Sequence, residues 1–270
     1  MKRAVITVIA LALAVILVQQ LGAPAFAQTQ GDYLENILRK KEVRVGIMLI
    51  VPPLGFRDAK NEPTGFDVEV AKRMAEALGA KLTIVEVLAA NRIPYLLSGR
   101  VDVVIGAFSR TTERTKSIDY TFPYVLTGPV IMTKKTSSIK GIKDLAGKRV
   151  SVVKGTTGAL WTKKLVPNAQ ILEFDTEPDT LLALKQGKVD ALVNDDTILS
   201  GYKKENPDLE MYGPPFYRDF LAFGVPKNQN NWRRWLNSFI YDMFNLGVID
   251  EIWPKYFNYA RPEFEITPMW

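Results

Sequence analysis

The chain of 270 residues contains neither cysteine nor histidine. Without cysteine it forms no disulfide bond, and it has no thiol that could carry a lipid anchor. Without histidine it lacks the serine–histidine and cysteine–histidine catalytic pairs, together with the commonest zinc ligand. An enzyme built from this chain would depend on carboxylate, lysine or tyrosine chemistry. The two absences therefore favour a binding protein over an enzyme, and we expect no cofactor.

Long hydrophobic runs are also missing, except at the N-terminus. Residues 4–18 are apolar apart from Thr7, two basic residues precede them, and Ala25 and Ala27 supply the small-x-small pattern cut by signal peptidase. These 15 residues are fewer than the roughly 20 that span a membrane. We expect residues 1–27 to be a signal peptide removed near Ala27, which leaves a soluble exported protein. A retained anchor helix is the alternative.

Neither sign of charge dominates the sequence. The chain has 35 basic and 29 acidic residues, a formal net charge of +6, and the two signs alternate along its length. No basic stripe of the kind that binds nucleic acid occurs. We therefore expect no nucleic-acid partner.

Apolar segments of strand length alternate with longer amphipathic segments over residues 43–225. Residues 64–80 are typical of a surface helix, because apolar residues from Phe66 to Met74 recur at helical spacing and Gly79 follows them. Alternation of strands and helices predicts an α/β fold in which helices cover parallel sheets.

A weak internal repeat indicates two domains. The segment LSGRVDVV at residues 97–104 is matched by KQGKVDAL at 185–192, 88 residues later. In each, a glycine ends a helix in the left-handed conformation and an aspartate, Asp102 or Asp190, precedes a buried strand. The repeat favours two similar α/β lobes, with chance recurrence of a common helix-to-strand joint as the alternative.

Polar residues follow three of the predicted strands, where ligands of open α/β sheets bind. The first group includes Ser109 and Arg114, the second is the Gly-Thr-Thr-Gly turn at 155–158, and the third is Asp195. The N–H groups and dipole of a helix that begins at the Gly-Thr-Thr turn suit an anion, and a guanidinium binds a carboxylate through two hydrogen bonds. The hydroxyl and the Asp195 carboxylate suit an ammonium group. Together these groups match an α-amino acid zwitterion.

Each of these residues also has a simpler interpretation when it is taken alone. Threonine and glycine at a helix start are usually caps, and Arg114 could form a surface ion pair with Glu113 or Asp119. Either Asp195 or Asp196 could cap the helix that follows. Only their joint placement at three strand ends favours a binding site.

At these residues the chain resembles the family-3 bacterial solute-binding proteins, the periplasmic polar amino-acid receptors of ABC importers. The likeness spans residues 43–258 and rests on five segments in the family's order and spacing: TGFDVEVAKRMAEALGAKL, IPYLLSGRVDVVIG, TTERTKSIDYTFPY, IKDLAGKRVSVVKGTTG and GKVDALVNDD. The resemblance implies a two-lobed periplasmic-binding-protein fold of type II with two hinge strands, near GPVIMTKK and FLAFGVPK. It places lobe 1 at residues 28–130 plus 223–270 and lobe 2 at 131–222.

The resemblance also implies roles for the site residues. Arg114 and the backbone N–H of Thr157 would grip the α-carboxylate of the ligand. Asp195, the Ser109 hydroxyl and the Ala107 carbonyl would receive its α-ammonium group.

The expected side-chain pocket departs from the commonest family pattern. Met48, Val51 and Ala89 stand where many members carry an acidic residue and aromatics, while Arg92 matches the arginine of acidic amino-acid receptors. We include Arg92, Phe108 and Val51 among the binding residues and expect glutamate or aspartate first, a small neutral or polar amino acid second, and basic amino acids last. A structural role for Arg92 is the alternative.

The expected function is therefore that of a monomeric periplasmic protein without a lipid anchor, which captures a free L-amino acid and delivers it to the membrane permease of an ABC importer. The enzyme alternative is an exported cyclohexadienyl (prephenate or arogenate) dehydratase on the same fold. That reaction needs a positioned carboxylic acid, and none stands out in the sequence. A receptor's ligand-sensing domain would need a transmembrane and signalling segment after Tyr259.

Overall fold

The computed structural model describes residues 32–265. The chain from Tyr33 onward forms one compact unit. The expected signal peptide lies outside the described residues. Among the described helices, none combines the length and the apolar character that crossing a membrane requires.

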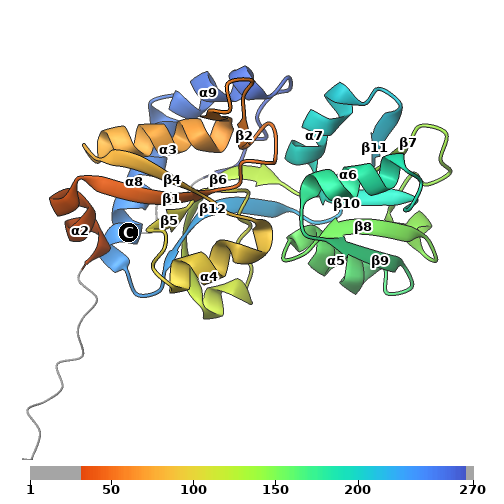
Figure 1. Ribbon diagram of the computed structural model, residues 1–270, viewed down its shortest axis with the longest axis horizontal. Coiled ribbons are helices and arrows are strands. Elements are labelled where there is room, and N and C mark those ends of the chain that lie inside the picture. Colours follow the sequence, from red (N-terminus) through yellow and green to blue (C-terminus); the bar gives the residue numbers. More distant parts are fainter. Residues whose placement is uncertain (1–31, 266–270) are drawn as a thin grey trace, which may run out of the picture. The chain divides into compact units, whose positions relative to one another are not determined.

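The first sheet combines strands from the beginning, middle and end of the unit (Figure 1). β1 pairs in parallel with β4 and β5, while β12 pairs antiparallel with β5 and β6. In the order β4-β1-β5-β12-β6, the strands are Lys81–Glu86, Glu42–Ile47, Val103–Val104, Asp219–Pro226 and Ile118–Thr127. The strands β1 and β5 are mostly buried, because helices cover both faces of the sheet.

The second sheet uses only the middle of the chain. Its order is β11-β7-β10-β8-β9, with β8 parallel to both β9 and β10 and with β7 antiparallel to its two neighbours. In that order the strands are Leu209–Tyr212, Pro129–Lys134, Ala191–Asp195, Arg149–Val153 and Gln170–Phe174. A separate two-stranded sheet pairs β2 with β3, at Phe56–Arg57 and Pro63–Thr64.

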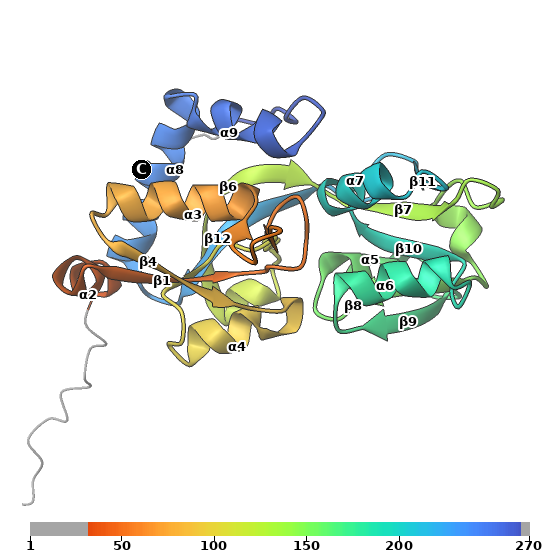
Figure 2. The same cartoon turned by 45° about the horizontal axis from the view of Figure 1, so that its top comes forward.

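Helices cover both sheets. α3 lies on one side of the first sheet and α4 on the other, as Figure 2 shows. The helices of this half are α2 (Tyr33–Lys40), α3 (Phe66–Ala77), α4 (Arg92–Leu97), α8 (Asn230–Asn245) and α9 (Val248–Tyr256). Those of the other half are α5 (Thr157–Leu165), α6 (Glu177–Lys185) and α7 (Asp196–Glu205). Short 3₁₀ turns occur at Ala89–Asn91, Arg114–Lys116 and Ile142–Leu145.

The chain passes between the sheets at two neighbouring places. Gly128 separates β6 from β7, and residues 213–218 connect β11 to β12. A side chain at Gly128 would lie 2.1 Å from the Tyr217 carbonyl oxygen, so the close approach of the two connections requires glycine there. The lobe boundaries expected from the sequence remain a prediction, whereas the sheet assignment puts all of β12 with the first sheet.

The two helix-to-strand joints of the internal repeat have the expected conformation. Gly99 and Gly187 adopt left-handed φ angles of 67° and 71° after α4 and α6. Asp102 and Asp190 then precede β5 and β10, both fully buried strands. The repeat therefore corresponds to a repeated element of structure.

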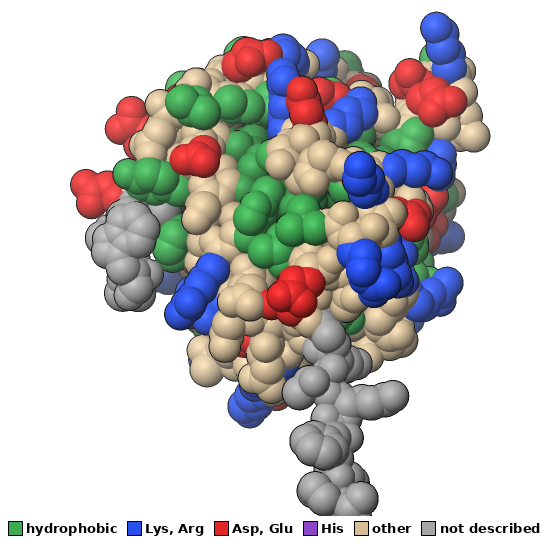
Figure 3. All heavy atoms as spheres, turned by 90° about the vertical axis from the view of Figure 1, so that its left-hand side faces the viewer, with side chains coloured by type: hydrophobic (Ala, Val, Ile, Leu, Met, Phe, Trp, Pro, Cys, Tyr) green, Lys and Arg blue, Asp and Glu red, His purple; other side chains and the backbone are tan. Residues whose placement is uncertain are grey.

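Acidic and basic side chains are mixed on one face of the molecule (Figure 3). On the face shown in Figure 3, acidic and basic side chains are interspersed around a group of hydrophobic ones. This face carries no stripe of one sign, in agreement with the alternation along the sequence.

Candidate functional site

A small polar cavity lies where strand ends of the two sheets meet. It is lined by Met48, Ala89, Arg92, Ala107, Ser109, Thr156, Thr157, Glu177, Asn194, Asp195 and Ile198. Its volume is about 10 Å³, which is room for about one water molecule. A ligand as large as an amino acid therefore enters only when the two sides of the cavity move apart.

The first-sheet side is formed by the segment that follows β5. The Phe108 carbonyl accepts a hydrogen bond from the backbone N–H of Ala222 in β12 at 3.1 Å. Ala107 has a positive φ of 46°, and its N–H donates to Asp67 Oδ2 at 3.1 Å. Tyr124 donates its hydroxyl to the other oxygen of Asp67 at 2.7 Å. Asp67 thus holds a strained turn in place.

Asp67 itself is buried at the start of α3. Burial raises its pKa to about 7, although the bonds from Tyr124 and Ala107 act in the opposite direction. Sequence reasoning did not identify this residue, because an aspartate in the first turn of a helix is ordinarily explained by the helix dipole.

Arg114 lies beside the cavity and connects its two sides. Its guanidinium donates to the carbonyls of Ser109 and Gly155, the second at 2.7 Å. It also lies over the Phe108 ring, 5.1 Å from the centroid. A guanidinium has five N–H groups, so these two bonds orient Arg114 without exhausting its capacity to bind a carboxylate.

Arg92 is fully enclosed, with 2% of its surface exposed. Its Nε donates to the Ala89 carbonyl at 3.0 Å, and one terminal nitrogen donates to the carbonyls of Gly106 and Ala107. The other terminal nitrogen reaches the Gly155 carbonyl across the cavity at 3.3 Å. Burial and the nearby Arg114 lower its pKa to about 10. All three of its nitrogens therefore already bind backbone oxygens, which agrees with the structural alternative for this residue.

The Gly-Thr-Thr turn opens α5 as expected. Thr156 caps the helix by accepting a hydrogen bond from the N–H of Ala159 at 3.2 Å. Thr157 is the first helical residue, and its hydroxyl lies 3.2 Å from that of Ser109. The helix start therefore faces the first-sheet segment directly, and the backbone there can meet an anion.

The structure separates the roles of the adjacent aspartates after β10. Asp196 accepts hydrogen bonds from the Thr127 hydroxyl and the Thr197 N–H, so it is occupied locally. Asp195 makes no side-chain capping bond and lines the cavity. Burial raises the pKa of Asp195 well above its usual value, and the nearby carboxylates of Asp219 and Asp196 add to the shift. A cationic ligand group at this point would stabilise the ionised form.

Two further polar residues of the cavity were not predicted from the sequence. Glu177 is 1% exposed and Asn194 is 3% exposed. Within the described part of the chain, Glu177 Oε2 and Asn194 Nδ2 are buried without a hydrogen-bond partner. Glu177 follows a capping threonine, which offered an ordinary explanation for an acidic residue at that position.

The predicted site residues are mostly brought together. Ala107, Ser109, Thr157, Asp195 and Arg92 line the cavity, and Arg114 and Phe108 adjoin it.

Val51 is not among the lining residues. It is fully buried, and its N–H donates to the Gly55 carbonyl at 2.8 Å in a turn. Across residues 32–265, no group of three or more acidic side chains is arranged to hold a metal ion.

Comparisons with known proteins identify the family of the chain. Residues 43–259 match the family described as bacterial extracellular solute-binding proteins, family 3. The ABC transporter glutamine-binding protein GlnH of Bacillus subtilis is 31% identical over 237 residues, which cover 86% of this chain and 87% of that protein.

Solved structures show the same fold. A solute receptor for L-cysteine from Neisseria gonorrhoeae superposes with a TM-score of 0.80 at 33% identity, covering 83% of this chain and 92% of that one. An ancestral amino acid-binding protein, a precursor of cyclohexadienyl dehydratase, gives a TM-score of 0.79 at 29% identity, covering 83% and 99%. The type II periplasmic-binding-protein fold expected from the sequence is thereby confirmed. The chain belongs to the bacterial extracellular solute-binding proteins of family 3.

Proposed function

We propose that this protein captures a free L-α-amino acid outside the cytoplasmic membrane and delivers it to the permease of an ABC importer. One observation carries the proposal: Ser109, Thr157 and Asp195 meet at a single enclosed cavity beside the Arg114 guanidinium. Arg114 and the start of α5 suit an α-carboxylate, while Asp195 and the Ser109 hydroxyl suit an α-ammonium group. The glutamine-binding relative supports the amino-acid class.

Capture would require a hinge motion. Hydrogen bonds cross the cavity: the Ser109 and Thr157 hydroxyls meet, and Arg92 and Arg114 both reach the Gly155 carbonyl. Opening would break these contacts, and closing over a ligand would replace them with bonds to its charged groups. The two neighbouring connections at Gly128 and residues 213–218 are where we expect the backbone to bend.

The remaining parts of the proposal concern the state of the protein in the cell. The N-terminal run followed by Ala25 and Ala27 supports export with cleavage near Ala27. Absence of cysteine supports a protein without a thiol-linked lipid anchor. We propose a periplasmic monomer that binds one ligand and then docks on the permease.

The ligand order expected from the sequence rests on Arg92. Its Nε and one terminal nitrogen donate to the carbonyls of Ala89, Gly106 and Ala107, while its bond to Gly155 crosses the cavity and would break on opening. The freed nitrogen suits a carboxylate oxygen or a carboxamide oxygen, so Arg92 alone does not favour an acidic ligand over a neutral polar one.

Isothermal titration calorimetry and thermal-shift measurements on the protein lacking residues 1–27 test the proposal. A ligand present at ~100 times its dissociation constant stabilises the folded state by about 2.7 kcal/mol. Arg114→Gln and Asp195→Asn should each weaken binding by ~2–5 kcal/mol, since each leaves one buried ligand charge without its partner. Glu205→Gln, on an exposed helix end, is the control. Wild-type affinity in either site variant would contradict the zwitterion site.

A second candidate function is favoured by one residue. Glu177 is a buried carboxyl group in the cavity, and burial raises its pKa to about 7, which suits a general acid. With Arg92 and Arg114 nearby, a cyclohexadienyl dehydratase acting on prephenate or arogenate is the enzyme that fits. The two candidates are distinguished by incubating the protein with prephenate and monitoring the ultraviolet absorbance of prephenate. Turnover supports the enzyme, and binding of amino acids without turnover supports the receptor.

A further inference from the structure

The second-sheet side of the cavity presents one acceptor and one donor that have no hydrogen-bond partner among residues 32–265. Glu177 Oε2 and Asn194 Nδ2 are both buried, and both residues line the cavity. The orientation of the Asn194 amide is fixed, because its oxygen accepts a hydrogen bond from the N–H of Asp195 at 2.9 Å. Buried polar atoms without partners are costly, so such a pair in a cavity marks where a ligand group would be bound.

A carboxyl oxygen and an amide N–H are the hydrogen-bonding complements of the two ends of a carboxamide. The amide NH₂ of a ligand would donate to Glu177 Oε2, and its carbonyl oxygen would accept from Asn194 Nδ2. The apolar side chains of Met48, Ala89 and Ile198 line the same cavity and would contact an aliphatic stem. Arg114 and Asp195 remain for the α-carboxylate and the α-ammonium group.

Charge argues against the neighbouring ligand classes. Burial raises the pKa of the Glu177 carboxyl, and the Arg92 charge opposes this rise only in part. A carboxylate side chain would meet the carboxyl groups of Glu177 and Asp195, which line the cavity, while Nε and one terminal nitrogen of Arg92 already donate to carbonyls. A cationic side chain would meet Arg92 and Arg114. A neutral group meets neither repulsion.

We propose, on the basis of the function proposed above, that Glu177 and Asn194 form the side-chain subsite of this receptor and select a neutral amino acid with a carboxamide, such as glutamine or asparagine. Glu177 accepts from the amide nitrogen and Asn194 donates to the amide oxygen. Selectivity over the isosteric acids follows, since glutamate or aspartate would leave Glu177 facing an oxygen instead of a donor.

Calorimetric titration of the wild-type protein with glutamine, glutamate, asparagine, aspartate and arginine is the first test. We expect the better amide ligand to bind at least ~100-fold more tightly than its isosteric acid, because a site built for a hydrogen-bond donor rejects the analogue that lacks it. Preference for glutamate, aspartate or arginine overturns the proposal while leaving the amino-acid receptor intact. Failure to bind any amino acid overturns the proposed function and this subsite with it.

Glu177→Gln then tests the residue. It keeps the shape of the side chain and removes its charge, so we expect the amide-to-acid affinity ratio to fall at least ~10-fold, mainly because the acid binds better. Thermal unfolding of the variant without ligand verifies that it folds, and Glu205→Gln should leave the ratio unchanged. A wild-type ratio in folded Glu177→Gln overturns the assignment. If the wild-type protein turns over prephenate and the Glu177→Gln variant does not, Glu177 is a catalytic acid and the proposal is also overturned.

Discussion

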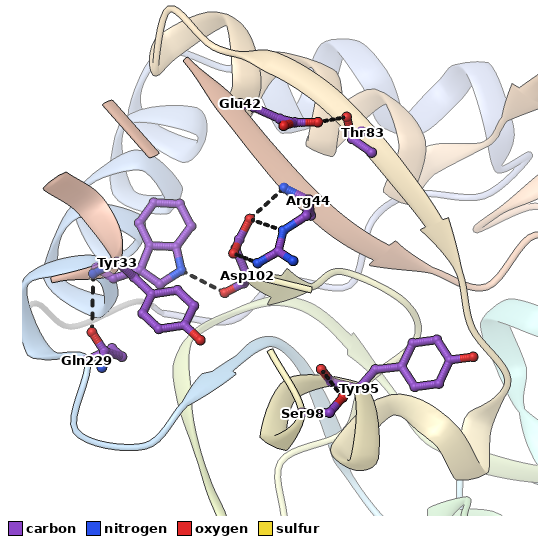
Figure 4. Close-up of polar contacts among 9 residues, drawn as sticks. Tyr33, Glu42, Arg44, Thr83, Tyr95, Ser98, Asp102 and Gln229 are labelled. Atoms are coloured by element: carbon purple, nitrogen blue, oxygen red, sulfur yellow. Dashed lines mark hydrogen bonds and ion pairs between the residues drawn. The ribbon is translucent and has the colours of Figure 1, made fainter. Parts of the chain in front are cut away.

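Each of the two helix-to-strand joints of the internal repeat contains an ion pair, and the two ion pairs have the same contacts. Asp102 pairs with Arg44 in the first sheet, and Asp190 pairs with Arg149 in the second. In the first, the carboxylate accepts from the Arg44 N–H at 2.8 Å and from two guanidinium nitrogens at 3.2 and 2.6 Å (Figure 4). In the second, the corresponding distances are 2.9, 3.2 and 2.7 Å. Both carboxylates therefore bind one arginine of a neighbouring strand, Arg44 in β1 or Arg149 in β8, in the same way.

The surroundings of the two joints differ. The Asp102 side chain is 9% exposed and that of Asp190 is 32% exposed. α2 and α8 cover the first joint: Trp232 donates its indole N–H to the Asp102 carbonyl at 3.0 Å, and Tyr33 interacts with both charges. The two ion pairs therefore share one geometry but should contribute unequally to the free energy of unfolding, because elements outside the repeat determine how far each carboxylate is buried.

Replacing Asp102 should give the largest effect. Asp102→Ala removes the buried acceptor of three hydrogen bonds, one from the Arg44 N–H and two from its partly exposed guanidinium, and we expect a loss of about 3 kcal/mol in the free energy of unfolding. Urea unfolding measures this loss. A cost below about 1 kcal/mol would mean that water replaces the carboxylate, and that the covering helices do not isolate the joint.

The cover of the first joint can be tested separately. Trp232→Phe removes the indole N–H, leaves the Asp102 carbonyl unpaired, and creates a small cavity at a fully buried position. We expect a loss of about 2 kcal/mol. Combined with Asp102→Ala in a double-mutant cycle, the two losses should fall short of additivity, since the residues share one contact. Full additivity would mean that Trp232 stabilises the protein independently of the Asp102 carboxylate.

Asp190→Ala should cost less than about half of the Asp102→Ala loss, because the second joint is open to water. The Arg149 guanidinium holds the pKa of Asp190 below its usual value. The contribution of Asp190 is therefore present at neutral pH and is lost as the pH falls through that lowered pKa. Urea unfolding at neutral and acidic pH should find that the gap between the wild type and the variant closes in acid. A gap that widens in acid would contradict the ion-pair origin.

Much of the fold could be read from the sequence because its signals are local. The helix from Phe66, the left-handed glycines and the strands after Asp102 and Asp190 all follow from periodicity and from turn chemistry within a few residues. The unequal cover of the two joints could not be read in this way. It depends on Trp232 in α8, 130 residues away from Asp102, and no local pattern specifies that contact.

The residues of the candidate site likewise fall into those that a local sequence pattern identifies and those that it does not. Ser109, Thr157 and Asp195 stand at strand ends, where the rule for open α/β sheets directs attention. Glu177 and Asp67 sit at helix starts, where an acidic residue has an ordinary explanation. Only the structure separates a solvated acidic residue from one that is 1% exposed, as both of these are.

The smallest difference should appear at the glycines of the two joints. A side chain at Gly99 would have the Tyr33 hydroxyl as its nearest neighbour at 3.8 Å, and one at Gly187 would have no described atom within 4 Å. Neither substitution clashes, so Gly99→Ala and Gly187→Ala should each cost about 1 kcal/mol for the left-handed conformation alone. Urea unfolding should find the two costs equal within about 0.5 kcal/mol. A larger cost at Gly99 would show that α2 constrains the backbone of the first joint as well as covering its charges.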